Sequence, residues 1–122
     1  MAALNFHERF ADKVESGEKT QTIRAFRKIP IEVGDTLYLY TGLRTKHARK
    51  LGEGKCISNG VIEIRGDAIW IRRRGSKVWI GGGKLDQFAK SDGFDSWEEM
   101  KKWWLNVHGL PFTGNIIEWE LL

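Results

Sequence analysis

Between residues 55 and 80 the chain carries three strand-like segments that are separated by very short turns. The segments span residues 55–64, 68–73 and 77–80, and the turns between them contain Gly66-Asp67 and Gly75-Ser76. Each segment is rich in β-branched or aromatic residues, which favour strands. A parallel pair needs a crossover of a dozen or more residues, so strands this close in sequence must pair antiparallel. The segment therefore predicts consecutive β-hairpins.

Three other segments show helical spacing of apolar residues. These residues are Phe6, Phe10 and Val14 in the first segment, Leu85, Phe88 and Ala89 in the second, and Trp97, Met100, Trp104 and Val107 in the third. The first helix is predicted over residues 6–16, with Gly17 as a left-handed stop. The third is predicted to begin at Ser96, where Ser-Trp-Glu-Glu forms a capping box.

Further strands are predicted on both sides of the hairpins. They span residues 20–24, 36–41 after the Gly34-Asp35 turn, and 115–122, and a basic loop is expected from residue 41 to about 54. A bulge is expected at Asn59-Gly60. With five or six strands and two or three helices, residues 1–122 are predicted to form a single α+β domain, built on a small, mostly antiparallel β-barrel or strongly curved sheet.

The chain is moderately basic, with a formal net charge of +4 and a pI near 9.3. Its basic residues gather in two runs, which contain Arg44, Lys46, Arg49 and Lys50 in the first and Arg72, Arg73 and Arg74 in the second. Such runs suit a polyanion or nucleotide partner. They equally suit a solvated loop and a charged edge strand that resists aggregation.

Several classes of protein are disfavoured by what the sequence lacks. A single cysteine, Cys56, excludes an intramolecular disulfide, and three histidines far apart in sequence give no metal-ligand spacing. No metal or other cofactor is therefore expected, and a reducing, cytoplasmic setting is the default. No apolar run approaches the length of a membrane span, so a membrane partner is not expected.

The stretch Gly-Glu-Lys-Thr-Gln-Thr-Ile-Arg, residues 17–24, concentrates polar side chains directly after the first predicted helix. In a strand Thr20, Thr22 and Arg24 share one face, while Lys19 leaves the glycine turn on a stem long enough to reach Thr22. A lysine with a lowered pKa can take the proton of a threonine hydroxyl. The segment is thus either a half-exposed strand or a reactive site in which Arg24 binds substrate oxygen.

The same stretch resembles the signature of the ASCH family, a branch of the PUA-like β-barrels. The segment Phe-His-Glu-Arg-Phe-Ala-Asp-Lys-Val-Glu-Ser-Gly-Glu-Lys-Thr-Gln-Thr-Ile-Arg is similar to the opening of small bacterial ASCH proteins that act as N4-acetylcytidine amidohydrolases. Residues 34–40, the late helix with its acidic turn, and residues 114–122 resemble later parts of the family. The middle of the chain, about 41–83, is longer and more divergent than in the shortest members.

The resemblance implies a substrate pocket and a catalytic group. The family's catalytic group consists of a lysine, a threonine and a carboxylate. The lysine and the threonine correspond to Lys19 and Thr22. The carboxylate corresponds less closely to Asp92, and Glu63 is a second candidate. Arg24, Thr20 and Tyr38 are the expected substrate-binding residues. The implied substrate is N4-acetylcytidine or a related N4-acylated cytosine nucleoside.

Two chemical routes and one other function remain open. Lys19 activates Thr22 as a nucleophile, or Lys19 and the carboxylate activate water while Thr22 positions the substrate. The alternative function is an RNA-binding or RNA-processing module that uses the basic runs.

The six tryptophans also fall into groups. Trp97 and Trp104 are predicted to lie in the core, and Trp103 faces either the pocket or solvent. Trp70 and Trp79 are expected to pair across a hairpin, with stacking on a nucleic-acid base as the alternative.

Overall fold

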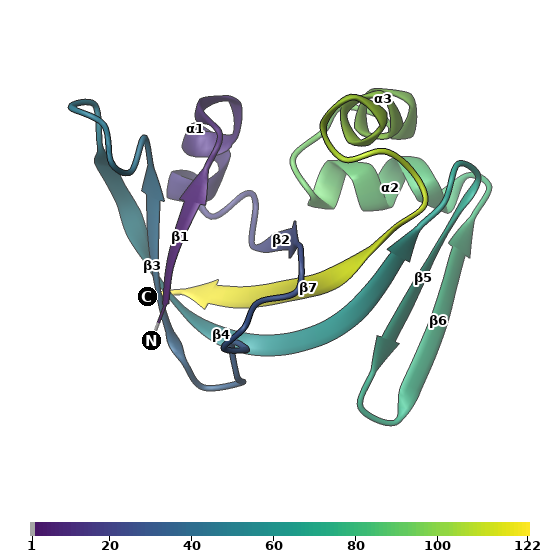
Figure 1. Ribbon diagram of the computed structural model, residues 1–122, viewed down its shortest axis with the longest axis horizontal. Coiled ribbons are helices and arrows are strands. Elements are labelled where there is room, and N and C mark those ends of the chain that lie inside the picture. Colours follow the sequence, from purple (N-terminus) through teal and green to yellow (C-terminus); the bar gives the residue numbers. More distant parts are fainter. Residues whose placement is uncertain (1) are drawn as a thin grey trace.

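The computed structural model describes residues 2–122 and contains seven strands and three helices. In chain order these are β1 (Ala2–Phe6), α1 (Glu8–Ser16), β2 (Gln21–Arg24), β3 (Thr36–Thr41), β4 (Arg49–Ile64), β5 (Ala68–Arg73), β6 (Ser76–Gly81), α2 (Lys84–Ser91), α3 (Trp97–Val107) and β7 (Phe112–Leu121). The sheet is mostly antiparallel and curls into a half-barrel (Figure 1). The α+β class and the strongly curved sheet are thus confirmed.

The long strands β4 and β7 form the spine of this sheet. They pair antiparallel from Gly54 opposite Leu121 to Ile64 opposite Phe112. Strand β3 pairs with the first part of β4 and β5 with its last part, so the sheet divides into two wings. Strand β1 adds to β3 in parallel, β6 adds to β5, and the short β2 adds to β7.

Three local predictions differ from the structure. Strand β1 was not predicted, because Phe6 fits the helical spacing although it ends β1 and His7 caps α1. The register of β4 shifts between Cys56 and Ser58 opposite β7, and between Gly52 and Lys50 opposite β3, rather than at Asn59-Gly60. The basic loop is shorter than predicted, because β3 supplies a ladder partner from Arg49 onward.

The helices begin and end largely as predicted. Gly17 has a φ of 84° and ends α1, and the Ser96 hydroxyl accepts a hydrogen bond from the Glu99 backbone N–H at the start of α3. Trp97 and Trp104 are buried, but Val107 is 54% exposed, because it lies in the last turn of α3 beyond the packed face. Within residues 2–122 no helix is long and apolar enough to cross a membrane.

Strand β2 lies between the two groups of helices that cover the sheet (Figure 1). Helix α1 lies above one wing of the sheet, α2 and α3 lie above the other, and β2 is between them (Figure 1). Side chains of β2 therefore meet residues from both ends of the chain.

Candidate functional site

Lys19 is fixed by the turn that joins α1 to β2. Its backbone N–H donates to the Lys13 carbonyl at 2.9 Å, and the next carbonyl, of Thr20, accepts from the Trp119 N–H at 3.0 Å. The side chain of Lys19 is only 3% exposed. A buried lysine requires a partner, since an unpaired charge in the interior is costly.

That partner is Asp92, 73 residues later in the chain. The Lys19 Nζ donates to the Asp92 backbone carbonyl at 2.5 Å and lies 3.2 Å from its Oδ1. The Gln21 Nε2 approaches the same carboxylate oxygen at 3.4 Å. Asp92 is 4% exposed, so the pair is almost completely removed from solvent.

Asp92 owes its position to the end of α2. Its N–H continues the helical hydrogen bonding to Phe88 and Ala89, and the following Gly93 has a φ of 97°. A Cβ at Gly93 would lie 2.9 Å from the Phe10 ring and 3.1 Å from Cδ of Lys19. Glycine is therefore needed here both for the left-handed turn and for the close approach of Lys19.

Burial shifts both members of the pair toward their neutral forms. Desolvation lowers the pKa of Lys19 below its usual range, although the charge of Asp92 opposes this. Desolvation likewise raises the pKa of Asp92, opposed mainly by the Lys19 ammonium. A lysine with a lowered pKa, next to a carboxyl group with a raised one, is a combination suited to proton transfer.

Thr22 has a different partner. Its Oγ1 accepts a hydrogen bond from Nε of Arg24 at 3.0 Å, and Nη2 of Arg24 donates to the Asn5 carbonyl at 2.8 Å. Burial, followed by the charge of Arg27, lowers the pKa of Arg24 to about 10. Across residues 2–122 no hydrogen bond joins Lys19 to Thr22, so the predicted direct contact between them is not formed.

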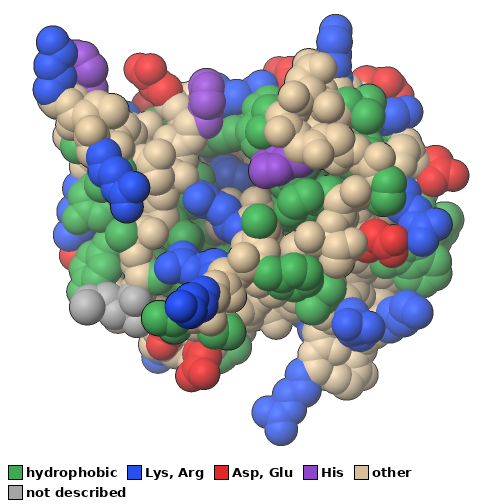
Figure 2. All heavy atoms as spheres, viewed as in Figure 1, with side chains coloured by type: hydrophobic (Ala, Val, Ile, Leu, Met, Phe, Trp, Pro, Cys, Tyr) green, Lys and Arg blue, Asp and Glu red, His purple; other side chains and the backbone are tan. Residues whose placement is uncertain are grey.

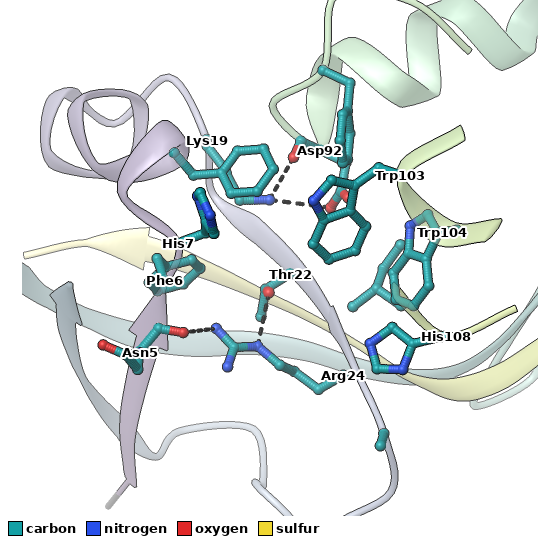
Figure 3. A pocket seen from close by; sticks show the side chains of 14 residues that line it. Asn5, Phe6, His7, Lys19, Thr22, Arg24, Asp92, Trp103, Trp104 and His108 are labelled. Carbon is teal, nitrogen blue, oxygen red and sulfur yellow. Dashed lines mark hydrogen bonds and ion pairs between the residues drawn. The ribbon is translucent and has the colours of Figure 1, made fainter. Parts of the chain in front are cut away.

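These groups line a cavity of about 300 Å³ between α1, β2 and α3. In Figure 3 Thr22 lies between Arg24 and the Lys19–Asp92 pair, with Phe6 and His7 to its left and Trp103, beside Asp92, and His108 to its right. The remaining wall is largely aromatic and includes Phe6, Phe10, Phe94, Trp103 and Trp104. On the face shown in Figure 2, histidine and basic side chains border a hollow near the centre.

The structure brings together four of the predicted site residues, namely Lys19, Thr22, Arg24 and Asp92. It does not bring Glu63, Tyr38 or Thr20 to the cavity wall. Glu63 lies on β4 in an ion pair with Arg65, and Tyr38 lies on β3 below the ammonium of Lys50. Thr20 precedes β2 and contributes its carbonyl to β7.

Sequence reasoning missed Asn5, His7, Gln21 and His108. Asn5 and His7 flank the end of the unpredicted β1, and His108 follows α3, so no local pattern connects them. Gln21 alternates with Thr22 along β2, yet its side-chain amide reaches the Asp92 carboxylate, and both residues are buried.

No group of three or more potential metal ligands occurs within residues 2–122. Comparisons of the chain with models of protein families, with curated proteins and with solved structures found no match.

Proposed function

We propose that the protein hydrolyses the exocyclic amide of N4-acetylcytidine or a related N4-acylated cytosine nucleoside, and that it is an ASCH-type hydrolase with a PUA-like fold. The observation that carries the proposal is the buried Lys19–Asp92 pair at an aromatic cavity that also holds Thr22 and Arg24. The half-barrel and the resemblance of residues 6–24 to the ASCH opening support the same assignment.

The cavity suits a planar, uncharged substrate. Its volume of about 300 Å³ is within the range of small-molecule sites. Rings of Phe10, Phe94 and Trp103 contact one another at centroid distances of 5.2–6.3 Å and form a continuous aromatic wall. A pyrimidine base would stack on this wall, and Arg24 would bind an oxygen of the base or of the acyl group.

In the proposed reaction Lys19 is the general base and the general acid. Neutral Lys19 takes a proton from water as the water oxygen attacks the acyl carbonyl. The resulting ammonium then gives a proton to N4 as the carbon–nitrogen bond breaks, which yields cytidine and the carboxylic acid and returns Lys19 to its neutral form. The acid ionises to the carboxylate by releasing its proton to solvent. Asp92 holds the ammonium while it exists, because an adjacent carboxylate favours the charged amine.

Thr22 is the alternative nucleophile. Its hydroxyl oxygen already accepts a hydrogen bond from Arg24, which would stabilise an alkoxide. Lys19, however, makes no hydrogen bond with the Thr22 hydroxyl in the described chain, because both hydrogen bonds of its Nζ go to Asp92. Direct transfer of the Thr22 proton would require the Lys19 side chain to move, whereas a water molecule needs no such direct contact. We therefore favour the route through water, with Thr22 positioning the substrate.

The direct test is release of cytidine from N4-acetylcytidine, followed by ultraviolet absorbance. Substrate-dependent release by the wild type, lost in Lys19→Met, would support the proposal, and an absence of release would contradict it. Mass spectrometry of the quenched reaction separates the routes: an acetyl group on Thr22 would establish the covalent route in place of activated water.

Asp92→Asn is expected to move the acid limb of the pH–rate profile to lower pH. The rate requires neutral Lys19, so it rises with pH through the Lys19 pKa. The Asp92 carboxylate raises that pKa, and its removal leaves the lowering effect of burial unopposed by this charge. The profile of kcat/KM between pH 5 and 10 measures the shift. Titration of the Lys19 Nζ by nitrogen NMR reports the same pKa if turnover is too slow. A limb that stays in place or moves to higher pH would contradict this assignment.

A further inference from the structure

The β5–β6 hairpin carries two adjacent tryptophans on its outer face. Trp70 and Trp79 are direct cross-strand partners, with ring centroids 6.4 Å apart. They are 36% and 55% exposed, whereas Ile69 and Ile71, which alternate with Trp70, are buried. The tryptophan face is therefore turned away from the core beneath α2 and α3. The predicted cross-strand pair is confirmed, and both rings remain accessible.

The environment of each ring differs. The ammonium of Lys77 lies 5.1 Å from the Trp70 ring centroid, so this ring already has a cation as a partner. Trp79 leans over Gly81, where a Cβ would be only 2.3 Å from atoms of the indole. Gly81 thus allows Trp79 to lie against its own strand while more than half of the residue stays exposed. Trp79 is the better stacking surface of the two.

Basic side chains surround this tryptophan pair. Two adjoining surface grooves share Val61 and Arg72, and their basic residues are Arg65, Arg72, Arg73, Arg74 and Lys77. Arg65 pairs with Glu63, and Arg73 with Glu118. In the part of the chain that the structure describes, Arg72, Arg74 and Lys77 have no carboxylate partner within ion-pair distance. Figure 2 shows basic side chains around the lower end of the molecule, where Figure 1 places the β5–β6 turn.

We infer that this face binds single-stranded nucleic acid, with a base stacked on Trp79 and phosphates along Arg72, Arg74 and Lys77. Cations without carboxylate partners are complementary to a polyanion. An exposed indole beside them provides a stacking surface for any base, and such stacking requires a base that is not already in a duplex. Duplexes and protein partners are therefore the less favoured occupants.

The inferred surface is independent of the proposed hydrolase site. None of the residues that line its two grooves also lines the cavity of Lys19 and Asp92. Loss of nucleic-acid binding and loss of hydrolysis can therefore be observed separately in the same preparation.

The first test is fluorescence anisotropy of a labelled ten-nucleotide oligo-uridine titrated with the full chain at low salt. Trp79→Ala is expected to weaken binding by about tenfold, the usual scale for loss of one stacked base, while Trp79→Phe retains most of it. Val78→Ala changes the same strand on its other face and serves as the control, with little change in affinity. Thermal melting verifies that each variant is folded.

The second test concerns the cations. In the double variant Arg72→Gln and Lys77→Gln, the slope of log affinity against log salt should become shallower by about 1.4, because each phosphate contact to a single strand contributes about 0.7. The matched double variant Lys101→Gln and Lys102→Gln removes the same charge from α3 and should keep the wild-type slope. Absence of salt-dependent binding by the wild type, equal effects of both double variants, or equal affinity of Trp79→Ala and wild type would each overturn the inference. So would sedimentation that shows a dimer for the wild type and a monomer for Trp79→Ala.

Discussion

Lys19→Met will lower kcat/KM for N4-acetylcytidine by about a thousandfold or more, which is within the range expected for loss of a general acid–base group. Methionine matches the length of the buried lysine stem but has no proton to accept or donate. The loss should appear mainly in kcat, because in the proposed reaction Lys19 acts on the reacting atoms, whereas the aromatic wall and Arg24 would bind the substrate. Steady-state kinetics at several pH values measures both parameters.

The Lys19 variant also removes the partner of a buried carboxyl group. Loss of one member of a buried pair commonly destabilises a protein by about 3–5 kcal/mol, although Asp92 can limit the cost by binding a proton. Circular dichroism and urea unfolding must therefore accompany the kinetics. Lys90→Met replaces an exposed lysine on α2 and should leave hydrolysis unchanged. A folded Lys19→Met variant with activity close to wild type would refute the role of Lys19.

Trp119→Ala is expected to decrease the free energy of unfolding by about 3–5 kcal/mol, as for other large core truncations. Trp119 lies on β7, is 1% exposed and contacts the Phe6 ring at 5.7 Å. A Cβ at Gly54 would be 2.7 Å from its indole, so the β4 residue that the indole covers has no side chain to fill the space left by the truncation. Urea denaturation, monitored by far-ultraviolet circular dichroism, measures the change.

Two variants separate the packing of Trp119 from general effects of losing a tryptophan. The Trp119 Nε1 is buried without a hydrogen-bond partner in the described part of the chain. Trp119→Phe removes this polar group along with some volume, so its cost should be clearly smaller than that of alanine. Trp79→Ala removes an exposed ring and should cost about 1 kcal/mol or less. Equal decreases in the free energy of unfolding in Trp119→Ala and Trp79→Ala would contradict the assignment of Trp119 to the core.

Much of the fold could be predicted because its signals are local. The turns at Gly66-Asp67 and Gly75-Ser76 determine the β5–β6 region, and Gly17 and Ser96 mark helix ends by their own backbone chemistry. Strand β1 was missed because its five residues show one short apolar alternation that merges with the spacing of α1. The bulge was predicted at the wrong residues because its position depends on where the neighbour of β4 changes from β3 to β5. That point is determined by tertiary packing and not by local sequence.

The residues of the candidate site also divide into those that local sequence could predict and those that it could not. Thr22 and Arg24 meet because they are two residues apart in one strand, which sequence alone establishes. The meeting of Lys19 with Asp92 depends on how the fold places the end of α2 beside the turn between α1 and β2, and it was expected only from a resemblance. His7 and His108 join the cavity from distant elements and carry no pattern of their own.

Strand β2 has consequences for the folding kinetics of the protein. In the described chain its ladder partner is β7, with Gln21 opposite Glu118 and Arg24 opposite Asn115. Pairing of such distant segments requires closure of a very long loop, which costs chain entropy before any contact compensates for it, and contacts of high sequence separation slow folding. The strand that carries Thr22 and Arg24 therefore cannot pair with its partner through contacts between residues close in sequence. Recovery of hydrolysis after dilution from denaturant should follow the global refolding phase, and compact intermediates that lack the β2–β7 pairing should be inactive.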